Sequence, residues 1–322
     1  MRAITQYSFG DPDVLRVVEI DRPKPIPTEV LIRVHAIGLN PIEAFIRRGS
    51  APMLGQPPFI LGWDISGVVE DVVPGVNRFR PGDEVFGMPF FPRPAAAYAE
   101  LVAAPSRQLA RKPSSLDHVH AAALPLAGLT AWQSLVDVAQ VQPGQRVLIH
   151  AAGGGVGHLA VQIAKGLGAQ VLATASGAKA DFVRGLGADE VIDYEVEDFA
   201  EVARDIDVVL ESVGGDYADR SLRTLRPGGL LVTLVERTNA QLAARVKAAG
   251  RRFAGITVEP DSSGLEKLAE WVDNGRLRVH VDEAFPLDAV GRAHRRLEGG
   301  VKGKLVLTPE LESGARAGAS GG

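Results

Sequence analysis

The strongest structural signal in this chain lies at residues 146–176, RVLIHAAGGGVGHLAVQIAKGLGAQVLATAS. An apolar strand pattern leads into a glycine cluster, and the cluster opens a helical pattern with apolar residues at Leu159, Ile163 and Leu167. A second strand pattern follows at 170–175. This order of strand, glycine turn, helix and strand predicts one unit of a parallel sheet whose loop binds phosphate.

The glycine cluster fits two spacings. Ala151, Gly154 and Gly157 form an A-x-x-G-x-x-G pattern, and Gly153 and Gly155 form a G-x-G pattern. Side chains here would obstruct a phosphate that approaches the N–H groups at a helix start. A purely structural tight turn also needs glycines, but the flanking strands and helix favour a dinucleotide site. The loop does not end in G-K-[ST], so an ATP or GTP loop is unsupported.

The residues after the second strand indicate which dinucleotide binds. An NAD site usually has Asp or Glu at this position to hold the ribose 2′-OH, and here it is occupied by Ser176 and Gly177. Ser176 can donate a hydrogen bond to a phosphate, and Lys179 supplies a positive charge. The nearest acid, Asp181, is expected in the first turn of the next helix. We therefore predict NADPH rather than NADH.

Strands and helices alternate on both sides of this loop, which predicts a doubly wound parallel sheet covered on both faces. Two helices are expected before it, from Asp117 toward Ala123 and from Leu129 to Val138. The strands are expected at 146–150, 170–175, 190–192, 208–211 and 230–235. The helices are expected at 157–167, 179–186 and 218–225.

The remaining segments predict a second, barrel-like β domain. Up to about residue 110, short strand patterns alternate with Gly and Pro turns, at 30–36, 64–73, 83–87 and 98–103. After about residue 255 come a helix at 265–274, a strand at 279–284, a helix at 287–297 and a strand at 304–307. This last part is too short for a third domain, so we expect it to pack back on the first.

Composition excludes several classes of function. The 322 residues carry 35 basic and 39 acidic side chains, a net charge of −4 without a basic cluster, which argues against nucleic acid as a partner. The longest apolar run, at 121–132, is too short to cross a bilayer, and the N-terminus does not resemble a signal peptide. We expect a cytoplasmic protein that does not bind membranes, with a disordered tail at 310–322.

Cysteine is absent from the chain, which removes thiolate zinc sites, iron–sulfur clusters and cysteine nucleophiles. His118 and His120 resemble a metal pair only superficially, since helix positions two apart face different directions. We therefore expect no bound metal.

The whole chain except its tail resembles the medium-chain dehydrogenase/reductase superfamily, in particular its zinc-independent NADPH quinone oxidoreductase branch. The segments that carry the resemblance are GLNPIEAFIRRG, PFILGWDISGVV, RFRPGDEVFGM, AAYAELV, ALPLAGLTAWQSL, HAAGGGVG, GADEVIDY, DVVLESVGG, RPGGLLV and GKLVL. The resemblance implies an α/β protein with a GroES-like β-barrel catalytic domain and a Rossmann domain. The corresponding boundaries are 1–118 for the catalytic domain, 119–258 for the Rossmann domain and 259–309 for the return to the catalytic domain.

The resemblance also implies roles for single residues. Asn40 and Thr130 would approach the nicotinamide or the substrate, and Ser176, Lys179 and Tyr194 would surround the 2′-phosphate. Further cofactor-binding positions would be Gly154, Gly155, Val156, Gly157, Val213, Gly214, Leu234, Val258 and Lys304. The family often has Asp where this chain has Glu43 and Glu211, and the extra methylene group moves each carboxylate. A homodimer, paired through an edge strand near 251–258, is also implied.

The expected chemistry is hydride transfer from NADPH to a small molecule. Reduction of a quinone or an activated C=C bond builds negative charge on oxygen, which a nearby hydrogen-bond donor would stabilise. Asn40 is the first candidate donor, although its amide can equally hold the turn before Pro41. Tyr98 is a candidate proton donor or a packing residue. The alternatives to a quinone reductase are an NADPH-dependent enone or enoyl reductase and a low-turnover NADPH-binding protein.

Overall fold

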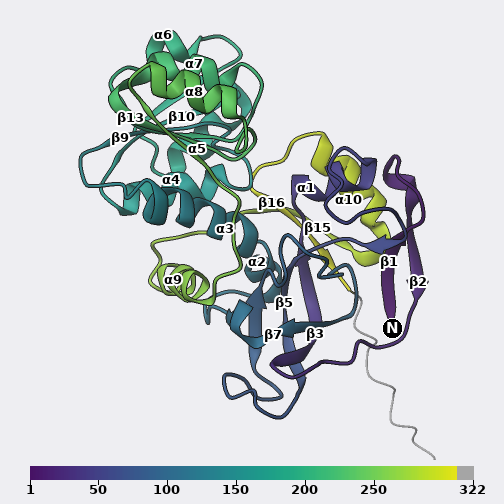
Figure 1. The fold of residues 1–322 in the computed structure, drawn as a ribbon. Coiled ribbons are helices and arrows are strands. Elements are labelled where there is room, and N and C mark those ends of the chain that lie inside the picture. The colour runs from purple at the N-terminus through teal and green to yellow at the C-terminus, as the bar shows by residue number, and fades with distance from the viewer. Residues whose placement is uncertain (310–322) are drawn as a thin grey trace, which may run out of the picture.

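A computed structural model describes residues 1–309 of the chain. One half holds a six-stranded parallel sheet between two layers of helices, and the other half holds a mostly antiparallel sheet (Figure 1). The prediction of a barrel-like β half joined to a doubly wound α/β half is therefore confirmed. The disordered tail expected at 310–322 lies outside the described residues.

The parallel sheet has the strand order β11-β10-β9-β12-β13-β14. Its strands are β9 (Arg146–Ile149), β10 (Gln170–Ala175), β11 (Glu190–Asp193), β12 (Ile206–Glu211), β13 (Leu225–Thr233) and β14 (Arg252–Gly255). Its helices are α4 (Gly157–Gly166), α5 (Ala180–Gly185), α6 (Phe199–Val202), α7 (Tyr217–Thr224) and α8 (Ala240–Ala248). Helices α4 and α5 cover one face and α6, α7 and α8 cover the other (Figure 1). The order of the strands reverses at β9, which lies beside both β10 and β12.

Most elements of this half begin and end within a few residues of their predicted bounds, and β10 has the predicted ones. The helix expected at 129–138 instead begins earlier, as α3 (Pro125–Trp132), and continues as a π-helix over Gln133–Val138. Pro125 is tolerated because a proline at the first helical position gives up an N–H that would have no helical partner anyway. Helices α6 and α8 were not predicted.

The antiparallel half has a seven-stranded sheet, with β15-β16-β3-β5-β6-β8 in order and β7 paired to β3. Its strands are β3 (Glu29–Gly38), β5 (Asp64–Val72), β6 (Glu84–Gly87), β7 (Leu101–Pro105), β8 (Leu109–Arg111), β15 (Val281–Pro286) and β16 (Lys304–Thr308). A three-stranded sheet contains β1 (Arg2–Gln6), β2 (Leu15–Glu19) and β4 (Phe59–Ile60). The helices outside the parallel-sheet half are α1 (Pro41–Arg48), α2 (His118–Ala122), α9 (Ser262–Asp273) and α10 (Val290–Glu298).

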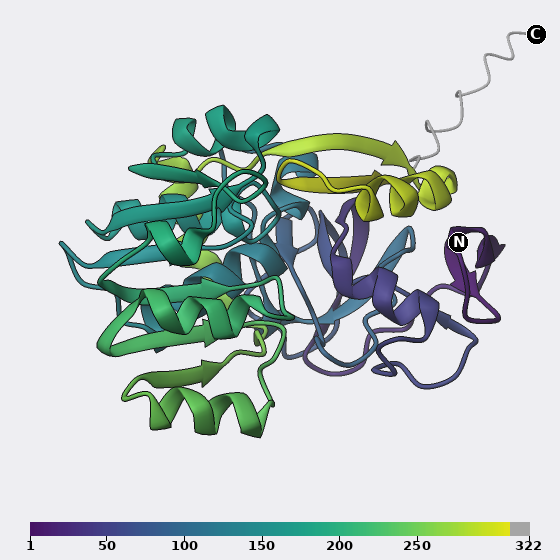
Figure 2. The ribbon, with the colours of Figure 1, turned by 90° about the horizontal axis from the view of Figure 1, so that it is seen from above.

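The C-terminal segment returns to the first half, as expected. Strand β16 pairs antiparallel with β3, so that Val306 lies opposite Gly38, and β15 adds on the outer side of β16. Figure 2 shows this yellow segment extending from the parallel-sheet half to the purple N-terminal half. The return brings Lys304, the first residue of β16, to the boundary between the two halves. No helix within residues 1–309 is long and apolar enough to cross a membrane.

Candidate active site

The glycine loop lies where β9 ends and α4 begins. Ala151 turns the chain with a positive φ of 48°, and the loop then folds back against the start of the helix. A Cβ atom on Gly157 would lie 2.3 Å from the Ala151 carbonyl oxygen and 2.6 Å from Ala152 Cα. Because both obstacles are backbone atoms, only glycine allows α4 to start this close to the loop.

The loop presents unused hydrogen-bond donors. Within the described chain, the backbone N–H groups of Gly155 and Val156 have no hydrogen-bond partner, and both residues are half-buried. Gly154 N–H, by contrast, donates to the Ala151 carbonyl at 2.9 Å. Two free N–H groups next to the positive end of a helix dipole suit the oxygens of a diphosphate. These residues therefore fit a dinucleotide cofactor.

Three residues expected around a 2′-phosphate lie at one edge of the sheet. Ala175 and Asp193 are paired at the ends of β10 and β11, so Ser176 and Tyr194 follow side by side. Lys179 lies one turn beyond Ser176 and donates its N–H to the Ser176 carbonyl at 2.8 Å. The Lys179 ammonium donates to the Val301 carbonyl at 2.7 Å, and burial lowers the pKa of this side chain.

The next loop along the sheet edge is shaped by Glu211, the last residue of β12. Its carboxylate accepts hydrogen bonds from Gly214 N–H at 2.6 Å and from the Thr233 hydroxyl at 2.8 Å. Val213 N–H also donates to it. The longer side chain of Glu therefore holds Val213 and Gly214 in place, while Leu234 N–H donates to the Glu211 carbonyl at 2.9 Å.

A second cluster, here called the Asn40 cluster, joins Asn40, Asp64 and Lys304. Asn40 Nδ2 donates to Asp64 Oδ2 at 3.0 Å, and Lys304 Nζ lies 3.3 Å from the same carboxylate oxygen. Lys304 Nζ also donates to Asn40 Oδ1. All three side chains are almost completely buried, with exposures of 2%, 0% and 3%. Burial raises the pKa of Asp64, against the opposing effects of Lys304 and Asn40.

The Asn40 cluster touches both the glycine loop and α3. A Cβ atom on Gly155 would lie 3.1 Å from Lys304 Cδ, so the lysine stem packs directly on the loop. Asp64 Oδ1 accepts a hydrogen bond from Leu126 N–H at 2.8 Å, and the hydroxyl of Thr130 donates to the Leu126 carbonyl at 2.6 Å. The fold thus gathers Asn40, Thr130, Lys304 and the glycine loop into one region.

Tyr98 lies behind this region. Its hydroxyl donates to Glu43 Oε2 at 2.7 Å and lies 3.1 Å from His294 Nε2, with the ring fully buried. Asn40 N–H donates to the same oxygen of Glu43 at 2.9 Å. Burial raises the pKa of Glu43 to about 7 and that of Tyr98 well above 10, and burial lowers the pKa of His294 to about 3. In this arrangement Tyr98 supports Glu43 and, through it, the turn at Asn40.

Asn40 and Lys304 were predicted site residues, but Asp64 was not predicted to join them. The available signal was a charged residue beside Trp63 at the start of a strand whose next five residues, 65–69, are mostly apolar. In residues 1–309, no group of three or more His, Asp or Glu side chains is arranged to hold a metal ion. That the protein binds no metal remains a prediction. His118 stacks on His35, with ring centroids 4.4 Å apart, and His120 contacts Asp117.

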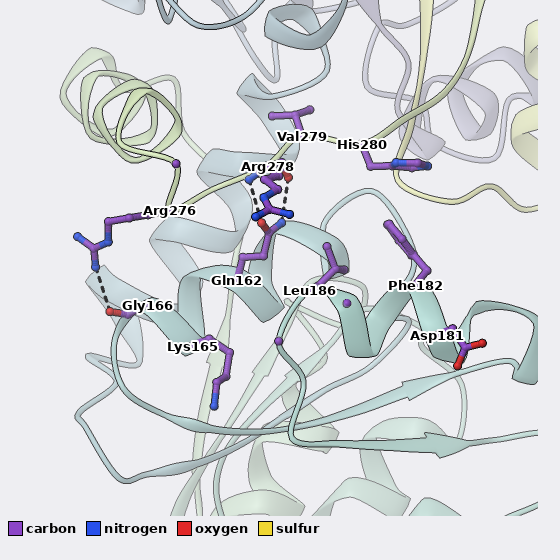
Figure 3. Close-up of a pocket in the computed structure, with 13 residues that line it drawn as sticks. Gln162, Lys165, Gly166, Asp181, Phe182, Leu186, Arg276, Arg278, Val279 and His280 are labelled. Atoms are coloured by element: carbon purple, nitrogen blue, oxygen red, sulfur yellow. Dashed lines mark hydrogen bonds between the residues drawn. The ribbon is translucent and has the colours of Figure 1, made fainter.

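A cavity of about 760 Å³ lies elsewhere, between α4, α5 and the chain that leads from α9 to β15. Its basic residues do not converge: Lys165 and Arg276 extend in different directions in Figure 3. Lys165 is paired with Asp189 at 2.8 Å, and Arg276 donates to the Gly166 carbonyl at 3.0 Å. Gln162 fixes the backbone of Arg278 through hydrogen bonds to its N–H and its carbonyl. This cavity contains none of the candidate site residues.

Family models match two stretches of the chain. Residues 26–114 match the alcohol dehydrogenase GroES-like domain, and residues 186–307 match the zinc-binding dehydrogenase domain. Among curated proteins, 2-haloacrylate reductase from Burkholderia sp is 35% identical over 94% of this chain and 98% of its own length.

Solved structures resemble the whole fold. Quinone oxidoreductase from Coxiella burnetii is 38% identical with a TM-score of 0.91, and the match covers 96% of this chain and 99% of that one. Escherichia coli quinone oxidoreductase complexed with NADPH is 30% identical with a TM-score of 0.87, covering 96% and 100%. These matches therefore include both sheets and the residues of the candidate site between them.

Proposed function

The chain belongs to the quinone oxidoreductase branch of the medium-chain dehydrogenase/reductase superfamily, and we propose that it reduces a quinone or a similar activated carbonyl compound with NADPH. Relatives named quinone oxidoreductase and 2-haloacrylate reductase support an NAD(P)H-dependent oxidoreductase in general. The choice of acceptor is the finer part of the proposal.

One observation carries this proposal. The free N–H groups of Gly155 and Val156 lie beside the stem of Lys304, whose ammonium reaches Asn40. A cofactor anchored at the glycine loop would therefore extend toward a buried, charged cluster. Such an arrangement binds a dinucleotide at one end and polarises an acceptor at the other.

The preference for NADPH is supported by the residues at the end of β10. Ser176 and Lys179 offer a hydroxyl and a cation where an acidic residue would hold the 2′-OH of NADH. Tyr194 follows the neighbouring strand and is 44% exposed, so its ring is accessible to a ligand. The relative solved with NADPH supports the same choice.

Bound NADPH supplies a hydride, and the residues of the chain position the reactants and exclude water. Gly154, Gly155, Val156 and Gly157 would hold the diphosphate. Val213, Gly214, Leu234 and Val258 would line the rest of the cofactor, and Thr130 would face the nicotinamide. Val258 is 6% exposed and already shielded from water.

An enone or enoyl reductase is the second candidate, and the relative named 2-haloacrylate reductase favours it. Both reactions place negative charge on oxygen, so the same charged cluster would serve either. A low-turnover NADPH-binding protein is the third candidate, which the same experiment separates from the two enzymes.

The test is NADPH oxidation with 1,4-benzoquinone, 9,10-phenanthrenequinone and a panel of enones, beside a measured Kd for NADPH. Faster turnover with quinones supports the proposal, and turnover with enones alone supports the second candidate. Tight NADPH binding without turnover on any acceptor supports the third.

We also propose that the protein is a zinc-independent homodimer in the cytoplasm. The chain lacks the cysteines that a thiolate zinc site needs, so EDTA should leave its activity unchanged. Strand β14 is one of the two edges of the parallel sheet and offers unpaired backbone groups to a second copy. Light scattering that finds only a 34.1 kDa species would remove the dimer from the proposal.

A further inference from the structure

Lys304 is a cation held inside the molecule. Its side chain is 3% exposed, and its ammonium contacts Asn40 Oδ1 and Asp64 Oδ2. An ammonium group has three N–H donors, and these two contacts use two of them. No other side-chain hydrogen bond of Lys304 occurs within residues 1–309, so one donor remains available.

The amide of Asn40, in contrast, is already fully engaged. Its oxygen faces the ammonium of Lys304, which can only donate, and its Nδ2 faces the carboxylate of Asp64, which accepts. The other hydrogen of Nδ2 points toward the Gly38 carbonyl at 3.5 Å. The neighbouring groups thus fix the orientation of the amide, and neither hydrogen is free for an acceptor molecule.

The position of Lys304 suits a role in the reaction. Its stem packs on Gly155 of the cofactor loop, and its head lies beside Asn40. Asp64 holds the head from one side while its other oxygen is bound to Leu126 N–H on α3. The ammonium is therefore held by Asn40 and Asp64 while its stem packs on the glycine loop. In surroundings of low dielectric, a fixed cation stabilises a developing negative charge strongly.

We propose that Lys304 Nζ donates a hydrogen bond, and then a proton, to the carbonyl oxygen of the acceptor. This inference rests on the proposed reductase function and narrows its substrate to compounds whose oxygen becomes anionic during reduction. Asn40 and Asp64 are positioning residues in this assignment, because they hold the ammonium and do not meet the acceptor.

The reduction balances with one hydride and one proton. The hydride carries both electrons and is supplied by bound NADPH, which is oxidised. As an O–H bond forms on the acceptor, an N–H bond of Lys304 breaks and leaves a neutral amine. A proton from solvent restores the ammonium after the product leaves.

The first test uses 4-nitrophenol as an oxyanion probe, because its ionised form has a distinct absorbance. In the complex of the wild-type protein with NADP⁺, the cation should favour the phenolate and lower the pKa of the bound probe. A bound probe that ionises as it does in water would overturn the proposal without any variant.

The second test compares Lys304→Met with Lys302→Met, a matched loss of charge two residues away. We expect Lys304→Met to bind phenolate at least about 10-fold more weakly and to reduce quinones about 100-fold more slowly, with an NADPH Kd within about 3-fold of wild type. Lys302→Met should match the wild type. An NADPH Kd that rises as much as turnover falls would make Lys304 a cofactor-binding residue instead.

A third variant, Lys304→Arg, separates charge from proton donation and covers a failure of Lys304→Met to fold. Arginine keeps the charge but does not release a proton, so phenolate binding should persist while turnover falls. Undiminished turnover in either variant would reject the inference and leave the reductase function standing. A probe shift without reduction of any acceptor would instead reject the reductase function.

Discussion

Asn40 donates its side-chain amide to Asp64 over 3.0 Å, and this contact joins the start of α1 to the start of β5. Asp64 Oδ2 receives two donors, and Oδ1 receives the backbone of Leu126. The carboxylate is thus the common acceptor for the N-cap residue of α1, for β16 and for α3. Its removal should affect the stability of the protein as well as its activity.

Asp64→Asn should destabilise the protein by about 3–5 kcal/mol, because it leaves the buried ammonium of Lys304 without a countercharge. The measurement is the apparent free energy of unfolding in urea. The control is Asp83→Asn, which breaks the ion pair between Asp83 and Arg111. The side chain of Asp83 is 21% exposed and that of Arg111 is 63% exposed. We expect the control to cost less than about 1 kcal/mol, and equal losses for the two variants would contradict the assignment.

Gly157→Ala should weaken NADPH binding at least about 10-fold and destabilise the chain by more than about 1 kcal/mol. The reason is the 2.3 Å approach of the added Cβ to the Ala151 carbonyl, which only a backbone shift can relieve. Fluorescence titration gives the Kd and urea unfolding gives the stability. Gly185→Ala is the matched control, since a Cβ there meets nothing within 4 Å and the position lies in α5. A normal NADPH Kd in Gly157→Ala would remove the loop from the cofactor site.

Much of the fold could be predicted because local patterns and global packing agree. The glycine loop and β10 have signals within a few residues of sequence, and the return of the C-terminal strand follows from a segment too short to form a domain of its own. Helix α1 was not predicted from its residues, since Asn40-Pro41 is equally typical of a turn. In the structure Pro41 begins the helix, and the carboxylate of Glu43 accepts the Asn40 N–H at its start.

The site was harder to predict than the fold because its chemistry depends on contacts across the chain. Lys304 and Asn40 are separated by 264 positions, and neither segment shows by itself that their side chains meet. The same is true of Tyr98, whose hydroxyl meets Glu43 and His294 from two distant segments. Residue types indicated the class of reaction, but the hydrogen-bond partners that decide each role come from tertiary structure.

Glu43→Gln should remove the part of the pH dependence of stability that comes from titration of the Glu43 carboxyl. Burial raises the pKa of Glu43 from 4.5 to about 7. The stability that the protonated carboxyl contributes is therefore fully present below pH 4.5 and is lost as the pH rises through about 7. The neutral variant should gain up to about 3 kcal/mol relative to wild type across this window. Glutamine can still accept from Tyr98 and Asn40 through its oxygen.

The measurement for Glu43 is the difference in unfolding free energy between variant and wild type at a series of pH values. His150, His158 and His294 have pKa values lowered by burial, so their contributions are lost as the pH falls, and they largely cancel in this difference. Tyr98 is hydrogen-bonded to Glu43, and the charges of Lys304 and Asp64 act on the Glu43 carboxyl. A difference that does not change with pH would show that the Glu43 carboxyl does not titrate there.

Lys179→Ala should raise the Kd for NADPH about 10-fold and leave the Kd for NADH nearly unchanged. One charge-assisted hydrogen bond to a phosphate accounts for an effect of this size, and NADH lacks that phosphate. The Lys179 ammonium donates one of its three N–H groups to the Val301 carbonyl, which leaves two donors for the phosphate when NADPH binds. Lys165→Ala is the control, because Lys165 is paired with Asp189 outside the site and should change neither Kd. Equal Kd values of the wild-type protein for NADPH and NADH would reject the preference for NADPH, since only the 2′-phosphate distinguishes the two cofactors.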